Sequence, residues 1–225
     1  NFKLIYDFEF YTYFSAIMAG LLKSESAIGF DNLKSSRRNL FSDTVLFNSS
    51  IHTKDNFLNL VSEGKSENNA IYNFKNIFDK LTVINKNGTP RIIVNPNAGK
   101  LAYERRLPKE TFIKIINHLT KNFKCKVLLT GAEDEMEYVE SIYLQLHSKA
   151  LVDNICGRTT IKELIALINS SVCLITSDSG PLHIASALDV PVIAFFGPEA
   201  PQRYGPLSER SLIFYNELPC SPCMS

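Results

Sequence analysis

Short apolar runs alternate with helix-patterned segments through the second half of the chain. The runs typical of buried strands cover residues 92–95, 126–130, 151–156, 172–176 and 192–196. Strands that are separated by helices pair in parallel, because a helical crossover returns the chain to the same edge of the sheet. The pattern therefore predicts an α/β fold with a doubly wound parallel sheet.

The segments between these runs have the spacing and the end signals of helices. Residues 108–122 place apolar side chains at helical intervals, namely Phe112, Ile115, Ile116, Leu119 and Phe123. Residues 133–146 begin with three acidic residues, which favour the positive end of a helix. Thr160 and Glu163 have the spacing of a capping box, and we expect Leu164, Ile165 and Ile168 to face the core.

The first part of the chain is less regular. Residues 4–8 and 27–30 read as strands, and residues 11–22 between them read as a helix. Residues 62–69 are polar and predict a surface loop, and residues 85–90 are polar with Gly88 and Pro90 before a buried strand. We therefore expect two domains, residues 1–88 and 89–225.

The turn between the last two predicted strands is the strongest candidate for a binding site. Residues 172–196 read as strand, tight polar turn, short helix beginning near Pro181, and strand. The first N–H groups of a helix attract anions, and Gly180 lets a ligand approach the backbone closely. Asp178 would place an acceptor at the carboxyl end of a strand, where open α/β sheets bind ligands. The alternative is an ordinary turn with a capping Ser179 and a solvated Asp178.

The overall composition excludes several classes of protein. The formal net charge is +1 and 21% of residues are charged, so no basic excess indicates a nucleic-acid partner. No apolar run reaches the roughly 18 to 20 residues of a membrane helix. Asp7 and Glu9 interrupt the apolar start, which is unlike a signal peptide. The chain lacks an initiating Met, and we expect both ends to be cut from a longer protein.

The five cysteines fall into two groups. Cys125, Cys156 and Cys173 lie in or beside apolar runs, and we expect buried thiols in a reduced, cytosolic protein. Cys220 and Cys223 form a C-x-x-C pair that is half a metal site, a redox pair or two inert thiols. A zinc site needs four ligands and the sequence holds no second pair, so we assign no metal.

Several motifs in order resemble one known family. Residues 178–188 read DSGPLHIASAL, residues 190–198 read VPVIAFFGP, and residues 203–206 read RYGP. Residues 93–99 (IVNPNAG), 105–108 (RRLP), 129–135 (LTGAEDE) and 155–164 (ICGRTTIKEL) extend the match. The set resembles the family 9 glycosyltransferases, the heptosyltransferases of lipopolysaccharide core assembly. It covers roughly residues 92–223 and, more faintly, the first sixty.

The resemblance implies a GT-B-like fold of two Rossmann-like doubly wound domains, of which the N-terminal one is incomplete here. It implies inverting transfer of a heptose or related sugar from a nucleotide-diphosphate donor such as ADP-heptose to a lipopolysaccharide core or related, lipid-linked or glycan acceptor. It implies a cytoplasmic enzyme without a cofactor, at the inner face of the membrane and in peripheral contact with it.

The resemblance also implies a set of donor-binding residues. These are Asn95, Arg105, Thr130, Asp178, Ser179, Gly180, Leu182, His183 and Gly197. The backbone amides from Ser179 to His183 would hold the diphosphate, Arg105 would pair with its oxygens, and Asp178 would bind sugar or ribose hydroxyls.

Each assignment has a plainer alternative. Arg105 and Arg106 also read as a solvated basic pair, His183 as a packed histidine, and Gly197 as part of a simple turn. The chain departs from the family pattern at Leu107, where Trp is usual, and at Glu199, where Thr is frequent. His118 and His147 read as residues of outer helix faces and receive no role.

No catalytic residue is assigned. The family's catalytic base is an Asp after the first strand of the N-terminal domain, and no segment here corresponds to it. Asp7 and Glu9 match a later element, and His52 reads as a loop histidine.

Three other functions remain to be weighed. The missing base favours a sugar-nucleotide-binding module without turnover. A dinucleotide oxidoreductase would share the sheet, but no G-x-G-x-x-G opens a helix. A C-x-x-C redox protein would carry the pair at a helix start after a strand, whereas Cys220 and Cys223 lie at the end of the sequence, which disfavours this function.

Overall fold

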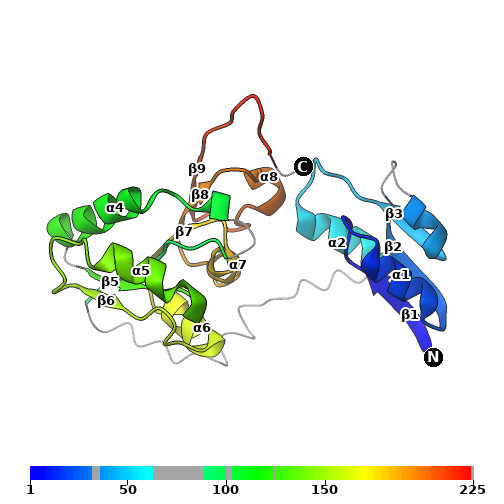
Figure 1. Ribbon diagram of the computed structural model, residues 1–225, viewed down its shortest axis with the longest axis horizontal. Coiled ribbons are helices and arrows are strands. Elements are labelled where there is room, and N and C mark those ends of the chain that lie inside the picture. The colour runs from blue at the N-terminus through cyan, green and yellow to red at the C-terminus, as the bar shows by residue number, and fades with distance from the viewer. Residues whose placement is uncertain (32–35, 63–88, 100–102, 124, 224–225) are drawn as a thin grey trace. The chain divides into compact units, whose positions relative to one another are not determined.

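A computed structural model describes residues 1–31, 36–62, 89–99, 103–123 and 125–223. The chain forms two units, Asn1–Ile71 and Tyr72–Ser225, which are blue to cyan and green to red in Figure 1. Residues 63–88 lie outside the described part. The predicted loop at 62–69 falls almost wholly within them, and the boundary between residues 88 and 89 adjoins them, so both stay predictions.

The N-terminal unit is a parallel sheet of three strands in the order β1-β2-β3. Its elements are β1 (Phe2–Asp7), α1 (Phe14–Leu21), β2 (Ser24–Asp31), the 3-10 helix η1 (Ser36–Leu40), β3 (Asp43–Leu46) and α2 (Thr53–Ser62). The predicted strand, helix and strand of the first thirty residues are all present. The later elements were not predicted, because residues 31–60 are polar and carry weak periodicity.

Helix α1 starts later than its apolar pattern suggested. Oε1 of Glu9 accepts the N–H groups of Phe10 (2.9 Å), Tyr11 (2.6 Å) and Thr12 (3.3 Å), which fixes these residues in a turn. These bonds, with that of Tyr11 the largest, lower the pKa of Glu9, because they favour the carboxylate. The prediction of a helix from residue 11 is therefore wrong by one turn.

A small aromatic core and one buried ion pair stabilise this unit. Phe30 and Leu60 are buried, and the ring of Phe10 stacks on that of Phe47 at a centroid distance of 3.9 Å. Nη2 of Arg37 lies 3.0 Å from Oδ2 of Asp7, and both side chains are buried. The carboxylate of Asp7, at the end of β1, is thus bound in an ion pair with Arg37 of η1.

The second unit contains six parallel strands in the order β6-β5-β4-β7-β8-β9. They are β4 (Arg91–Asn95), β5 (Lys126–Leu129), β6 (Val152–Asn154), β7 (Cys173–Ser177), β8 (Val192–Phe196) and β9 (Ser211–Tyr215). The five predicted strands are confirmed. Strand β9 was missed because only the four-residue helix α8 (Pro201–Tyr204) precedes it, and so short a helix leaves no periodic pattern in the sequence that would indicate a crossover to another strand.

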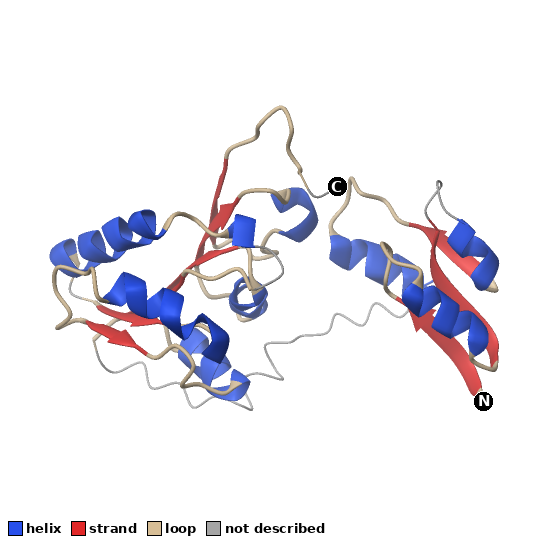
Figure 2. Cartoon of the chain, in the orientation of Figure 1, coloured by secondary structure: helices blue, strands red, loops and turns tan. Residues whose placement is uncertain are grey.

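Helices connect these strands, and their alternation can be followed in Figure 2. They are α4 (Lys109–Asn122), α5 (Met136–Tyr143), α6 (Ile161–Asn169) and α7 (Gly180–Ala187), with the 3-10 turns η2 (Tyr103–Arg105) and η3 (Glu133–Glu135). The helix expected over residues 133–146 is divided: its acidic start forms η3 and α5 ends at Tyr143. Phe123, which was included in the helical spacing, follows α4 and is 54% exposed.

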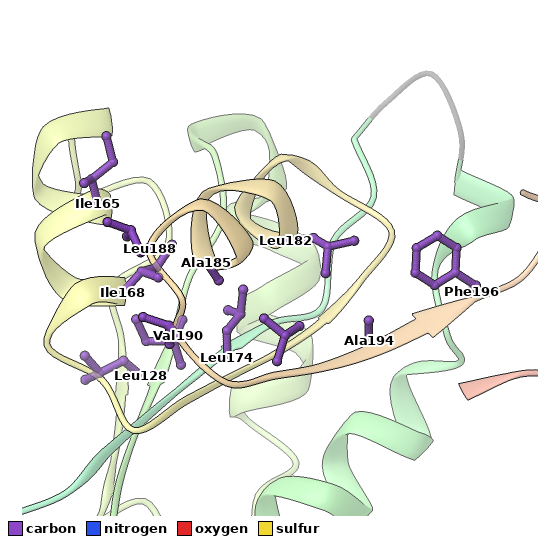
Figure 3. Close-up of a cluster of buried hydrophobic side chains, with 12 residues drawn as sticks. Leu128, Ile165, Ile168, Leu174, Leu182, Ala185, Leu188, Val190, Ala194 and Phe196 are labelled. Atoms are coloured by element: carbon purple, nitrogen blue, oxygen red, sulfur yellow. The ribbon is translucent and has the colours of Figure 1, made fainter. Parts of the chain in front are cut away.

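Alternate residues of the strands face two different cores. Leu128, Leu174 and Ala194 pack with α6 and α7, and Figure 3 shows these side chains converging with Ile168 and Leu182. The neighbouring residues along the strands pack with α4 and α5 in a second cluster, which comprises Val94, Val127, Leu129, Ile175, Phe112 and Ile116 among others. Since side chains alternate across a sheet, the two clusters cover its opposite faces.

The cysteines of the apolar runs lie mainly in the interior of the protein. Cys125 and Cys156 are buried and Cys173 is half-buried, so the expected burial is complete at two of three positions. Burial raises the pKa of Cys156 to about 11, with Glu135 adding to the effect.

Within the described ranges, none of the helices is both long and apolar enough to cross a bilayer.

Candidate functional site

A cavity of about 580 Å³ opens at the carboxyl ends of β4, β5 and β7. Asn95 at the end of β4 and Asp178 directly after β7 border it, and the chain order of the strands reverses between these two neighbouring strands. In open α/β sheets such a reversal leaves a crevice, because the connections leave the two strands toward opposite faces. The cavity therefore lies where ligands bind in this class of fold.

A network of short polar side chains forms the floor of the cavity. Nδ2 of Asn95 lies 3.1 Å from Oγ of Ser179, and Oγ1 of Thr176 lies 2.9 Å from the same oxygen. Nδ2 of Asn97 donates to Oδ1 of Asn95 and to the carbonyl of Thr130, both at 3.1 Å. The ends of β4, β5 and β7 are thus joined through buried side chains.

Ser179 is the residue that precedes α7, but its side chain makes no capping bond to the helix. Its hydroxyl is instead used by Asn95 and Thr176. The plainer interpretation of this turn, a capping serine beside a solvated aspartate, is therefore wrong. Asp178 is 3% exposed, which excludes the solvated aspartate as well.

The start of α7 is open on the side of the cavity. A Cβ added to Gly180 would meet no heavy atom within 4 Å, and Gly180 borders the cavity together with Pro181 and His183. His183 is exposed, so the packed alternative for this histidine is wrong. The positive end of the helix dipole faces this space.

Two of the predicted site residues lie elsewhere. Leu182 is fully buried in the core beneath α7, and its N–H donates to the carbonyl of Ser179 at 3.1 Å. Gly197 does not border the cavity; a Cβ built there would lie 3.7 Å from the carbonyl oxygen of Glu104. The other seven predicted residues border the cavity: Asn95, Arg105, Thr130, Asp178, Ser179, Gly180 and His183.

Arg105 joins two buried carboxylates at the edge of the cavity. Its Nη1 lies 3.3 Å from Oδ2 of Asp178, and its Nη2 lies 3.5 Å from Oε1 of Glu199. The side chain of Arg105 is 27% exposed and both carboxylates are 4% exposed. The interpretation of Arg105 as a solvated cation is therefore wrong.

Burial raises the pKa of both Asp178 and Glu199, and the guanidinium of Arg105 opposes this rise. His183 also lowers the pKa of Asp178, which places the imidazole within electrostatic reach of the carboxylate. Oδ2 of Asp178 forms no hydrogen bond of good geometry with any described residue. It is a buried acceptor whose hydrogen-bonding capacity is not filled within the described residues.

Arg106 does not line the cavity, but it contacts Glu135, which does. Its guanidinium lies over the rings of Tyr103 and Tyr138, at 4.5 and 4.3 Å from their centroids. Its Nη2 lies 3.5 Å from Oε1 of Glu135, and Oε2 of Glu135 accepts the N–H of Ala132 at 2.9 Å. This arrangement ties the η2 turn to the loop that follows β5.

The start of α6 supplies the less polar end of the cavity. Oγ1 of Thr160 accepts the N–H of Glu163 at 3.3 Å, and Oε2 of Glu163 accepts the N–H of Thr160 at 2.7 Å, which confirms the capping box. Ile161 and Leu164 border the cavity beyond this cap. Leu164, expected in the core, divides its surface between core and cavity.

The three residues of the N-terminal unit that the sequence analysis considered beside the missing base all have structural contacts. Asp7 is ion-paired with Arg37, and Glu9 is held by three backbone N–H groups. Nδ1 of His52 accepts the N–H of Lys54 at 3.0 Å just before α2. His118 is exposed on α4, as expected, whereas His147 is exposed but lies after the end of α5, so its expected place on a helix face is wrong.

Sequence reasoning underestimated Glu199 and Arg106. Glu199 was noted only as a departure from the family pattern, and Arg106 only as part of a solvated basic pair. The partners of both residues lie far away in the sequence. The signal available for Glu199 was its place directly after a strand and the turn Gly197-Pro198, where buried acids are uncommon unless they are paired.

The comparisons with known proteins agree on one family. Residues 14–225 match the family model described as glycosyltransferase family 9 (heptosyltransferase). The chain is 31% identical over 145 residues to lipooligosaccharide heptosyltransferase 2 of Campylobacter jejuni, a match that covers 63% of this chain and 45% of that protein. It is 31% identical over 111 residues to lipopolysaccharide heptosyltransferase 2 of Salmonella typhimurium, covering 48% and 32%.

Solved structures share the fold. Escherichia coli heptosyltransferase WaaC with ADP superposes with a TM-score of 0.73 at 16% identity, covering 95% of this chain and 66% of that one. Escherichia coli ADP-heptose lps heptosyltransferase II gives a TM-score of 0.68 at 18% identity, covering 94% and 67%. The expected GT-B-like α/β fold is confirmed, and the match to the Campylobacter relative spans about 45% of that protein's length. The chain belongs to glycosyltransferase family 9, the heptosyltransferases.

Proposed function

We propose that this protein takes part in lipopolysaccharide core assembly by transferring a heptose or a related sugar from a nucleotide-diphosphate donor, ADP-heptose or a close analogue. Family membership supports glycosyl transfer. The observation that carries the donor assignment is the pairing of Arg105 with Asp178 beside the open start of α7, in a cavity of about 580 Å³. That volume is in the range of small-molecule sites, about 300 to 1,000 Å³.

The diphosphate would lie at the start of α7. Gly180 leaves room for phosphate oxygens next to the backbone, and the helix dipole favours their charge. Arg105 would meet the same oxygens from the side and stabilise the charge that develops on the leaving diphosphate. Leu182, whose amide is already bonded within the turn, is left out of this assignment.

The sugar and the nucleoside would lie at opposite ends of the cavity. Asp178 presents a buried acceptor oxygen, which suits a sugar hydroxyl. Ile161 and Leu164 supply an apolar surface at the start of α6, which suits the faces of a nucleobase. Asn95 and Thr130 would act from the floor, where the Oγ1 atom of Thr130 is buried without a hydrogen-bond partner among the described residues.

The acceptor would be a lipid-linked lipopolysaccharide core or a related glycan, approached at the cytoplasmic face of the membrane through peripheral contact. All five cysteines are free thiols, which agrees with a reducing compartment. The transfer would invert the anomeric centre through a single displacement. The base that takes the acceptor proton receives no residue in this proposal.

Calorimetric titration with ADP, UDP and GDP tests the donor site. We expect one nucleotide to bind selectively, and we expect Asp178→Ala and Gly180→Val to weaken it at least tenfold. Glu209→Ala, which removes an exposed acid before β9, is the matched control and should bind as the wild type does. Turnover is then measured with the preferred nucleotide's heptose derivative and a lipopolysaccharide acceptor. A folded protein that binds none of the three nucleotides would overturn the proposal.

A further inference from the structure

Glu199 is a buried acid that contacts a residue lining the donor cavity. Its side chain is 4% exposed, and it does not border the cavity, whereas its partner Arg105 does. Glu199 therefore meets the lining of the cavity through its contact with Arg105, Nη2 to Oε1 at 3.5 Å. An acid in this position costs desolvation energy and touches no ligand, so its role must be sought in what it does to Arg105.

The loop that carries Glu199 is fixed at several points. The carbonyl of Pro198 accepts the N–H of Cys223 at 2.8 Å, and the carbonyl of Ala200 accepts the N–H of Arg203 at 3.0 Å. Ala200 is buried at the start of α8. A carboxylate on such a loop offers a fixed partner for the long side chain of Arg105.

Arg105 is shared between two anchors of different kinds. Nη1 faces Asp178, which borders the cavity, and Nη2 faces Glu199, which does not. A guanidinium held by Asp178 alone would be free to rotate about that single contact. Held from both sides, it keeps a defined plane at the cavity edge.

The charges near Glu199 come from three residues. Arg105 and Arg203 attract its carboxylate, and Asp178 repels it. If Glu199 acted only through the electrostatic repulsion between its carboxylate and a diphosphate, removing its negative charge would strengthen the binding of that diphosphate. If it acts by holding Arg105, removing it would weaken that binding. The two roles thus predict opposite signs.

We propose that Glu199 is a positioning residue of the donor site, which holds Nη2 of Arg105 so that the guanidinium stays oriented toward the diphosphate beside Asp178. This inference rests on the proposed function, because it takes a nucleoside diphosphate as the ligand. It also gives a physical role to a residue that departs from the Thr frequent at this position in the family.

The test is the dissociation constant of ADP, measured by calorimetry for the wild type and four variants. These are Glu199→Ala, Glu199→Gln, Arg105→Ala and the double variant with alanine at both positions. We expect Glu199→Ala to raise the constant about tenfold, and Glu199→Gln, which keeps an oxygen acceptor for Nη2, to raise it by less than about threefold. The double variant should bind like Arg105→Ala alone, because Glu199 has no effect without its partner.

Unchanged or tighter binding by Glu199→Ala, or effects that multiply in the double variant, would overturn the inference. Glu209→Ala controls for the loss of an acid, and unfolding midpoints control for the fold. If Glu199→Ala does not fold, Glu199→Gln decides: a dissociation constant below that of the wild type overturns the positioning role. If the wild type binds no ADP but binds UDP or GDP, the series is run with that nucleotide. Binding of none would overturn the proposed function together with the inference.

Discussion

Nη1 of Arg105 lies 3.3 Å from Oδ2 of Asp178, so a cation that precedes α4 compensates a carboxylate at the end of β7. Asp178 is almost fully buried and repels Glu199 nearby. The two acids share Arg105, so this guanidinium stabilises both of the loops that carry them.

Arg105→Ala should lower the free energy of unfolding by about 2 kcal/mol near neutral pH, because it leaves two buried carboxylates without their shared cation. Both acids have raised pKa values in the folded state. Their contribution to stability is therefore greatest at low pH and falls as the pH rises through the folded pKa values. Denaturation at pH 5 and 7.5 measures the effect, and the deficit should be smaller at pH 5.

The control for Arg105→Ala is Lys126→Ala, which breaks an exposed pair with Asp153, 2.7 Å apart. Exposed pairs contribute about 0 to 1 kcal/mol, so this variant should stay close to the wild type. An Arg105→Ala deficit that is equal at both pH values would contradict the electrostatic explanation.

Gly180→Val and Gly131→Ala should have opposite consequences, although both glycines border the cavity. A Cβ at Gly180 meets no atom within 4 Å, so valine should fold normally and obstruct the ligand. A Cβ at Gly131 would lie 2.5 Å from Nδ2 of Asn97 and 2.7 Å from Sγ of Cys156. We expect Gly131→Ala to cost about 1 to 3 kcal/mol through overpacking.

Thermal unfolding and nucleotide titration of these two glycine variants separate the effects. A destabilised Gly180→Val protein, or a Gly131→Ala protein as stable as the wild type, would show that the local packing differs from that described.

Asn95→Ala should destabilise the floor of the cavity by about 1 to 3 kcal/mol, because it removes the partner of Ser179 and of Asn97 at a site that is 3% exposed. Ser179→Ala should cost less, since Thr176 keeps another acceptor in the carbonyl of Ser177. A double-mutant cycle in chemical denaturation measures the coupling between Asn95 and Ser179. Additive effects would mean that their contact contributes nothing to stability.

The capping box of α6 should make stability depend on the ionisation of Glu163. Its pKa is lowered by hydrogen bonds from the N–H and the hydroxyl of Thr160. A lowered pKa gives a contribution that is present above the ordinary pKa and is lost as the pH falls through the folded value. Glu163→Gln should therefore be less stable than the wild type at pH 7, and this difference should shrink below about pH 4.

Unfolding midpoints across this pH range measure the difference. Glu137→Gln, which neutralises an exposed acid of α5, is the control. A deficit of Glu163→Gln that persists unchanged at pH 3 would contradict the assignment.

The strands were predictable where local signals agree. The run of β8 is bounded by Pro191 and Gly197, and its predicted ends match the structure. Strand β9 has an equally apolar sequence, but Leu212 and Phe214 are 55% and 51% exposed, and the crossover that leads to it is unusually short. Its place at the sheet edge is decided by pairing with β8, which no local pattern announces.

The candidate site was predictable as a location but not as a set of contacts. The turn around Asp178 can be recognised in the sequence, because an apolar strand pattern ends there and a helix begins directly after it. The partners of Arg105 lie on loops after two other strands, and only the sheet order brings them together. Leu182 shows the reverse case: it lies inside the motif, but helix geometry turns its side chain into the core.

The parallel order of the six strands has a consequence for how this protein can change. Every strand delivers its next loop to the same edge, while the two cores lie behind that edge on either face of the sheet. Substitutions in the loops can therefore alter which ligand the proposed donor site accepts while the packing that holds the sheet stays intact. Donor preference and stability can accordingly diverge independently among relatives, and exchange of loops between them offers a route to new donor specificities.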